Sequence, residues 1–108
     1  MISLSAKKDF DCVYKSNKKW HNPYFILFFK DNTQKRLGLC VSKKVGKATC
    51  RNLVKRRLRN IYKDTLNSLK CGDMIILAKN GIDLVDYKRL QNDYIYALKR
   101  LNIMERKC

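Results

Sequence analysis

The sequence contains few of the residues from which active sites and metal centres are built. His21 is the single histidine among 108 residues, only nine residues are acidic, and no paired carboxylates stand out. The five cysteines are odd in number and none lies in a Cys-x-x-Cys spacing; they are Cys12, Cys40, Cys50, Cys71 and Cys108. We therefore expect reduced thiols, no metal site and no catalytic residue in this protein.

Long apolar runs are also missing. The longest one covers residues 24–29, whereas a helix that spans a membrane needs about 20 apolar residues. The N-terminus lacks the basic segment and the apolar run of about 7 to 15 residues that mark a secretion signal. These absences predict a cytoplasmic protein that does not enter a membrane.

Positive charge is what the chain has in excess. Lysine and arginine number 25 against nine acids, so the formal net charge is +16 and the isoelectric point is near 9.9. Such an excess opposes folding by self-repulsion, and we therefore expect a polyanionic partner, of which nucleic acid is the commonest. Charge alone leaves two alternatives open, improved solubility and binding to a membrane surface.

The apolar content predicts a folded domain. Hydrophobic residues make up 45% of the chain and aromatic residues 10%, which is too much for a disordered polycation. Two separate domains would each be too short to bury enough surface. We therefore expect residues 1–108 to form a single RNA-binding domain.

Hydrophobic periodicity predicts six elements in the order α-β-β-α-β-α. Polar residues 16–23 are predicted to form a loop, and residues 31–36 are short enough to close an antiparallel hairpin. The elements are a helix capped by Ser5 and ending near residue 15, strands at 24–29 and 37–42, a helix at 50–69, a strand at 74–78 and a helix at 86–102. This order predicts an α+β fold with three helices packed on a small mixed sheet.

The two longer predicted helices each have one apolar stripe that is expected to face the core. Thr49 is the candidate N-cap of the first of them, and Gly72 suits a left-handed position after its end. Its stripe consists of Val54, Leu58, Ile61, Thr65 and Leu69. The stripe of the last helix consists of Tyr87, Leu90, Tyr94, Ala97 and Leu101.

Residues 33–63 contain no acidic residue. Like charges four residues apart destabilise an isolated helix by about 0.2–0.5 kcal/mol per pair, so a helix that carries them without acids is expected to meet an anion. The basic side chains would form a rigid ridge for phosphate groups, and the free amides at the helix start would add an anion site. The alternative is an ordinary solvated basic face. The basic residues are Lys35, Arg36, Lys43, Lys44, Lys47, Arg51, Lys55, Arg56, Arg57, Arg59 and Lys63.

Three aromatic side chains form a second candidate binding feature. Phe10 and Tyr14 are four residues apart and share one helix face, and Phe28 lies in the first predicted strand. Their rings are flat surfaces on which unpaired bases can stack. Aromatic pairs at helical spacing are more often core residues, so this interpretation depends on the basic context.

The basic segment carries a family resemblance. Residues 42–48 read Ser-Lys-Lys-Val-Gly-Lys-Ala, and Arg-Asn at 51–52 and Lys-Arg at 55–56 follow. This pattern resembles the strand end and long basic helix, with its Arg-Asn-Arg element, of the bacterial ribonuclease P protein subunit. Residues 8–14 and 72–78 are similar to that family's first helix and late strand. The sequence departs from this pattern at Leu53, which stands in place of the second arginine of the Arg-Asn-Arg element. Either Arg57 supplies the missing positive charge from one turn later, or this RNA contact is weaker.

The resemblance implies a fold, a function and partners. The family has three helices on a four-stranded sheet with a left-handed βαβ crossover, a ribosomal-protein-S5-domain-2-like fold. Its member proteins assist a catalytic RNA that removes the 5′ leader of precursor tRNA, with Mg²⁺ bound mainly by the RNA and no organic cofactor. No membrane or obligate protein partner is implied.

The family's site residues carry over to matching positions in this sequence. By resemblance, the residues that bind the catalytic RNA are Lys44, Lys47, Arg51, Asn52, Lys55, Arg56 and Arg59. Those that bind the leader are Phe10, Tyr14, Phe28 and Lys43. No residue of the protein is expected to be catalytic.

Three other functions remain open from the sequence. A ribosomal or other structural RNA-binding protein would share the charge and the fold class. A DNA-binding regulator would place residues 50–69 in a major groove, but the short supporting helix upstream is missing. An intrinsic nuclease would need more acid–base residues than the sequence offers.

Overall fold

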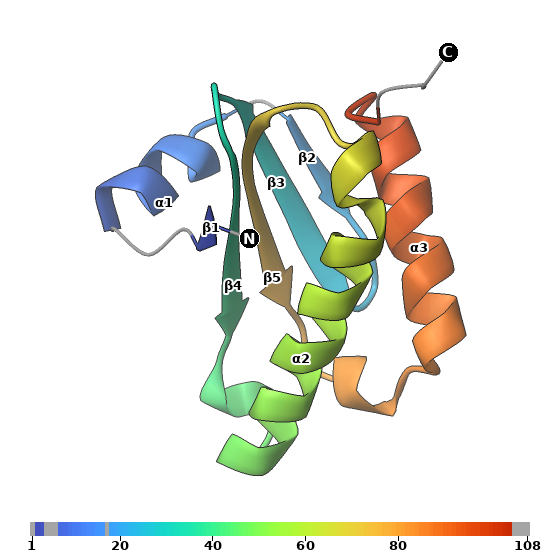
Figure 1. The fold of residues 1–108 in the computed structure, drawn as a ribbon. Helices are drawn as coiled ribbons and strands as arrows, with labels where there is room; N and C mark the ends of the chain where they lie inside the picture. Colours follow the sequence, from blue (N-terminus) through green and yellow to red (C-terminus); the bar gives the residue numbers. More distant parts are fainter. Residues whose placement is uncertain (1, 4–6, 17, 105–108) are drawn as a thin grey trace.

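The computed structural model describes residues 2–3, 7–16 and 18–104. The predicted cap at Ser5 lies outside these residues. Among them, no helix is both long and apolar enough to cross a membrane. The elements are β1 (Ile2–Ser3), α1 (Lys7–Tyr14), β2 (Lys18–His21), β3 (Phe25–Asp31), β4 (Lys35–Val41), α2 (Ala48–Thr65), β5 (Gly72–Ala78) and α3 (Tyr87–Arg100), with 3-10 turns η1 (Lys43–Val45), η2 (Leu66–Ser68) and η3 (Ile82–Leu84) (Figure 1).

The strands form one mixed sheet in the order β1-β4-β5-β3-β2. The predicted hairpin of the strands now seen as β3 and β4 is wrong, because β5 lies between them, antiparallel to β3 and parallel to β4. A strand as apolar as β5, buried at six of its seven positions, belongs at the centre of a sheet. The short connection permitted a hairpin but did not require one.

The β4–α2–β5 unit is left-handed. In Figure 1 both strands point downward, and α2 crosses on the near side from β4 to β5 at its right. Crossovers between parallel strands are right-handed in about 98% of cases, so this topology is distinctive. The left-handed crossover is the one that the family resemblance implies. The three helices packed on a mixed sheet confirm the α+β fold class that the sequence predicts.

The loop predicted at residues 16–23 is wrong, because β2 lies within it. Its four residues alternate between half-buried and exposed, and Trp20 faces the core. β2 is an edge strand, where polar and lysine side chains are tolerated and even favoured. Its polar composition therefore concealed a strand.

α2 and α3 cover one face of the sheet and share the main core. All five residues of the predicted α2 stripe are buried, although α2 ends at Thr65 and the 3-10 turn η2 separates it from Leu69. In the α3 stripe, Leu90, Tyr94 and Ala97 are buried, whereas the two end residues are half-buried. The helical periodicity thus predicted the packed faces correctly.

α1 lies on the opposite face of the sheet, apart from α2 and α3 (Figure 1). It packs on β3 and β5 through a small separate cluster, in which Val13 and Ile75 are fully buried and Phe10 and Phe28 are partly buried. The sheet therefore separates a large core from a small, aromatic one.

Gly72 does not occupy the left-handed position predicted for it. It begins β5, and the glycines with positive φ among the described residues are Gly46 and Gly81. A side chain at Gly72 would collide with the Phe29 ring and lie 2.7 Å from the Lys30 carbonyl oxygen. Close approach of β3, and not helix termination, is why this position suits glycine.

Replacing Leu58 by alanine should lower the free energy of unfolding by about 2–5 kcal/mol, because it leaves a cavity in the main core. Arg59→Ala is the matched control one residue further along α2, where the side chain is exposed, and it should change stability by no more than about 0.5 kcal/mol. Denaturant unfolding of the two variants measures the difference. Equal losses would contradict the assignment of the α2 faces.

Candidate nucleic-acid interface

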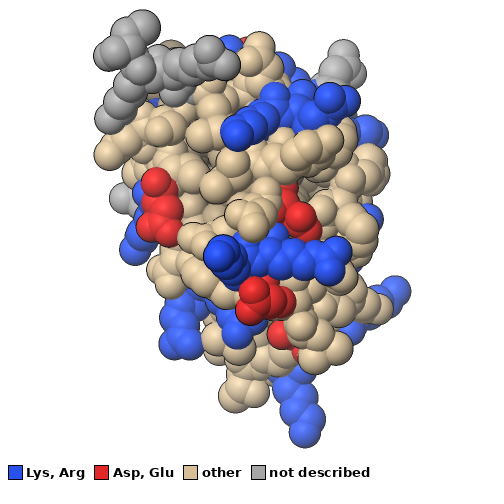
Figure 2. Space-filling view, turned by 90° about the vertical axis from the view of Figure 1, so that its right-hand side faces the viewer, with Lys and Arg blue, Asp and Glu red and all other residues tan. Residues whose placement is uncertain are grey.

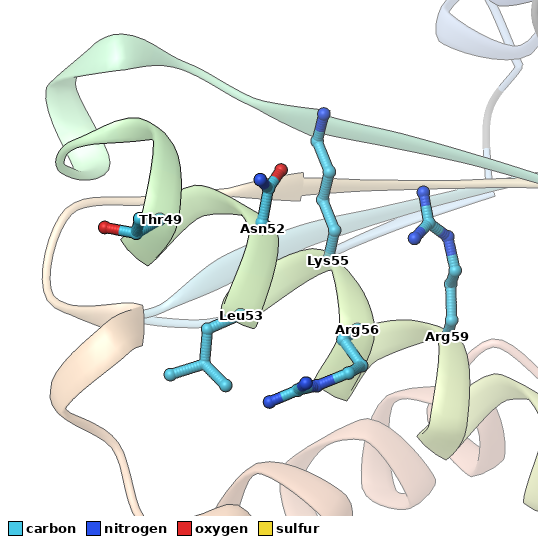
Figure 3. A pocket seen from close by; sticks show the side chains of 6 residues that line it. All are labelled: Thr49, Asn52, Leu53, Lys55, Arg56 and Arg59. Carbon is cyan, nitrogen blue, oxygen red and sulfur yellow. The ribbon is translucent and has the colours of Figure 1, made fainter.

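Most side chains predicted to bind the catalytic RNA share one surface of α2. Four of them line a shallow hollow together with Thr49 and Leu53: Asn52, Lys55, Arg56 and Arg59. Figure 3 shows Asn52, Lys55 and Arg59 projecting from one side of α2 and Arg56 from the other, next to Leu53. We call these four residues and their two neighbours the α2 hollow. Leu53 is half-buried and absent from the core, as its helical position predicts.

The N-terminus of α2 extends this surface. The predicted N-cap at Thr49 is wrong, because α2 begins at Ala48 and Lys47 occupies the cap position. No side chain caps the helix there, since lysine carries no acceptor. The free amides of the first turn therefore lie beside Lys47 and the exposed lysines of η1, Lys43 and Lys44. Free amides and nearby cations together favour an anion.

These cations have no acidic partners within the described part of the chain. The ion pairs found there involve only two basic residues, Arg36 and Arg89. The remaining predicted contact, Arg51, is half-buried near the start of α2 and is likewise outside these pairs. Repulsion between the unpaired cations is relieved when phosphate groups approach.

The side of the molecule formed by α3 has a different charge pattern. Figure 2 shows carboxylates among the cations on this side. Arg89 lies 3.9 Å from Asp93, and Arg89 and Arg100 lie over the rings of Tyr24 and Trp20. Arg89 and Arg100 thus have partners within the protein, unlike the cations of the α2 hollow.

Phe10, Tyr14 and Phe28 meet in one cluster on the other face of the sheet, which we call the aromatic cluster. The ring centroids of Phe10 and Tyr14 are 6.1 Å apart, and those of Tyr14 and Phe28 are 4.9 Å apart in an edge-on arrangement. Tyr14 is 36% exposed, whereas the two phenylalanines are partly buried. The cluster is therefore neither interior core nor a set of free surface rings.

Tyr14 keeps its phenol neutral. Burial against the sheet, followed by the neighbouring Cys40 and by Asp11, raises the pKa of Tyr14 to about 12. A tyrosine phenol is already neutral near pH 7, and the raised pKa extends this neutral range further into alkaline pH, so the ring does not repel a phosphate group. A neutral exposed ring is suited to stacking on a base.

The strand β2 adds two side chains that the sequence interpretation missed. Lys19 pairs with Phe28 and His21 pairs with Ile26 in the antiparallel register, so both project to the side of the aromatic cluster. Both are exposed. They were missed because their segment was interpreted as a loop, and Trp20 between them was the one signal of a strand.

Lys43 is not part of the aromatic cluster. It lies in η1, beside Lys44 and just before α2. Tyr14 contacts Cys40, which is three residues before Lys43. The end of β4 thus joins the aromatic cluster to Lys43, and the three residues from Cys40 to Lys43 span at most about 10 Å.

The described residues contain no group of three or more histidine, cysteine or acidic side chains placed to hold a metal ion. The cysteines described there are free: Cys12, Cys40, Cys50 and Cys71. The chemistry visible in this part of the chain is that of cationic and aromatic recognition.

Comparisons with known proteins agree on one family. The family model described as Ribonuclease P matches residues 2–102. A ribonuclease P protein component from Nitratiruptor sp. is 36% identical over 99 residues, covering 92% of this chain and 91% of the relative. One from Streptococcus pyogenes serotype M5 is 31% identical over 105 residues, covering 95% of this chain and 88% of the relative.

Solved structures are similar as well. The RNase P protein of Staphylococcus aureus matches with a TM-score of 0.87 and 27% identity, covering 97% of this chain and 99% of that one. The RNase P protein of Thermotoga maritima matches with a TM-score of 0.80 and 30% identity, covering 93% and 97%. The likeness therefore extends over nearly the whole chain in both sequence and fold.

Binding of a structured RNA to the α2 hollow should depend strongly on salt, because phosphate contacts release counterions. Arg56→Ala and Arg59→Ala should each lower the slope of log affinity against log salt concentration by about one unit. Lys88→Ala, which removes an exposed cation from α3, is the control and should leave the slope unchanged. A wild-type slope near zero, or an equal effect of Lys88→Ala, would contradict the assignment.

Proposed function

Because this chain belongs to the bacterial ribonuclease P protein family, whose members assist removal of the 5′ leader from precursor tRNA, we propose that its two surfaces hold two different RNA molecules. The α2 hollow binds the catalytic RNA, and the aromatic cluster binds the leader. The observation that carries this proposal is the position of the two surfaces on either side of one sheet: α2 packs on the face of the main core, and the aromatic cluster lies on the other.

Binding of the catalytic RNA is attributed to cations that lack partners in the described protein. Phosphate contacts of this kind set affinity and register without reading sequence. Asn52 is the uncharged member of the set and can both donate to and accept from a base or a phosphate. The set comprises Lys44, Lys47, Arg51, Asn52, Lys55, Arg56 and Arg59.

Binding of the leader is attributed to stacking. Leaders differ in sequence, and base–aromatic stacking tolerates sequence because every base has a flat face. Lys19 and His21 lie on the same side as Phe28 and are placed to meet backbone phosphates. A leader that stacks on Tyr14 and follows the end of β4 reaches Lys43, which supports a phosphate contact there.

The chain works as one RNA-binding domain in the cytoplasm, where precursor tRNA is made. The family's reaction depends on magnesium through its RNA. Mg²⁺ held by the RNA would supply the activation of a water and the stabilisation of the leaving oxygen in phosphodiester hydrolysis. The cations of the α2 hollow reduce the repulsion between RNA phosphates, so the protein assists by stabilising the folded RNA in which the Mg²⁺ sites are formed. No protein residue takes a catalytic role in this account.

Phe10→Leu and Tyr14→Leu should each weaken binding of precursor tRNA to the reconstituted complex by about 1–3 kcal/mol, the cost of one lost stacked base. Affinity for mature tRNA and for the catalytic RNA should stay almost unchanged, because neither contacts the aromatic cluster. Tyr96→Leu is the control, since Tyr96 is a 55% exposed ring on α3. Equilibrium binding of the precursor, of mature tRNA and of the catalytic RNA measures the three effects.

Equal losses for precursor and mature tRNA would reject the aromatic cluster as the leader site. A purely structural role would lower the melting temperature and reduce all three affinities together. Truncation of Lys55 should give the converse pattern, with weaker assembly and unchanged preference for the precursor.

A further inference from the structure

α1 is held on the sheet by few apolar contacts, although it carries two of the three rings of the aromatic cluster. Val13 is its only fully buried residue. The cluster beneath it consists of Val13 and Ile75 with Phe10 and Phe28 partly buried. A helix of eight residues is also too short to be stable by itself. Other contacts must therefore contribute to the position of Phe10 and Tyr14.

A network of ion pairs connects α1 to two strands. Arg36 in β4 donates from Nε to Oδ1 of Asp73 and from Nη2 to Oδ2 of Asp73, both at 2.7 Å. Its remaining terminal nitrogen, Nη1, donates to Oδ2 of Asp9 in α1 at 3.3 Å. The guanidinium group of Arg36 thus connects β4, which carries it, to both β5 and α1.

The two-point contact between Arg36 and Asp73 fixes the orientation of the guanidinium group. The Asp73 side chain is only 6% exposed, and burial alone would raise its pKa, but hydrogen bonds from Arg36 and Asn32 hold the pKa below its ordinary value. The carboxylate is therefore charged near neutral pH, and its two-point contact orients the guanidinium plane. A planar group fixed in this way presents its third nitrogen in one direction only.

We propose that Arg36 is a positioning residue for leader binding: anchored by Asp73, it holds α1 through Asp9 so that Phe10 and Tyr14 remain in stacking positions beside Phe28. This inference rests on the leader site proposed above. Asp9 directly precedes Phe10 in the chain, so a shift of the helix at Asp9 moves that ring with it. Arg36 itself need not touch RNA.

Simple electrostatics predicts the opposite effect of removing Asp9. A carboxylate beside the path of a polyanion repels it, so its neutralisation alone should strengthen leader binding. If Asp9 instead positions α1, neutralisation should weaken leader binding. The sign of the change therefore separates the two explanations.

Asp11 provides the matched control. It lies in the same helix two residues later, is exposed, and forms no ion pair with the described residues. Asp11→Asn removes the same charge from α1 without removing the contact to Arg36. Asp9→Glu keeps the charge in the first turn, where it also favours the helix, and its longer side chain can still reach the guanidinium.

The experiment uses the full chain reconstituted with its catalytic RNA and compares precursor with mature tRNA. Asp9→Asn should reduce the preference for precursor about two- to fivefold, the equivalent of one partly exposed ion pair. It should raise KM for the precursor with kcat, the melting temperature and the affinity for the catalytic RNA unchanged. Asp9→Glu should retain most of the preference, and Asp11→Asn should leave it equal or higher.

The outcomes separate this inference from the proposed function. If Phe10→Leu lowers the preference for precursor and Asp9→Asn does not, the leader site stands and the positioning role of Arg36 is wrong. If Asp9→Asn and Asp11→Asn change the preference in the same direction, the effect is one of charge alone and the role is also wrong. If Phe10→Leu has no effect, the leader site itself fails and this inference fails with it.

Discussion

The central strand β5 is the constraint on which both proposed binding surfaces depend. Its side chains alternate between the two faces of the sheet, so that Met74 and Ile76 belong to the main core under α2 and α3, whereas Ile75 supports α1. Asp73 of the same strand anchors Arg36. Because β5 is hydrogen-bonded on both sides, a change in its register would displace the α2 hollow and the aromatic cluster together.

The distribution of charge follows from this arrangement. Self-repulsion among 25 basic residues is tolerable only where the cations reach solvent or an anion. Among the described residues, the acids that form ion pairs are Asp9 and Asp73 in the Arg36 network and Asp93 on the α3 side, and none of these pairs involves a cation of the α2 hollow. Acidic residues are thus used where a cation must be oriented within the protein, and the surface attributed to RNA is left with its full charge.

Local patterns were sufficient to predict much of the fold. The stripe at steps of three and four along α2 identified its buried face, since helical periodicity needs no knowledge of the rest of the chain. Strand pairing was beyond such patterns: the hairpin was wrong because β5, more than 30 residues further along the chain, displaces β4 from β3. β2 was missed because an edge strand can be polar.

Local sequence patterns likewise predicted only part of the candidate site. The cationic residues of α2 were identified from the missing acids and the family resemblance, and the structure brings three of them, Lys55, Arg56 and Arg59, into one hollow with Asn52. Arg36 counted only as one more basic residue in the sequence, because its partner Asp73 is 37 positions away and Asp9 is 27. Contacts of that separation leave no periodic signal, and a role in positioning is visible only in three dimensions.

The central claim, that the two surfaces hold two different RNA molecules, can be tested by cleavage from a tethered iron chelate. One variant keeps the exposed Cys12 of α1 as its only thiol, and a second carries Thr49→Cys in the α2 hollow with the native cysteines changed to serine. In the complex with catalytic RNA and precursor tRNA, the account predicts cuts in the leader from Cys12, and cuts in the catalytic RNA with none in the leader from position 49. Cutting of the leader from position 49, or its absence from Cys12, would contradict the account.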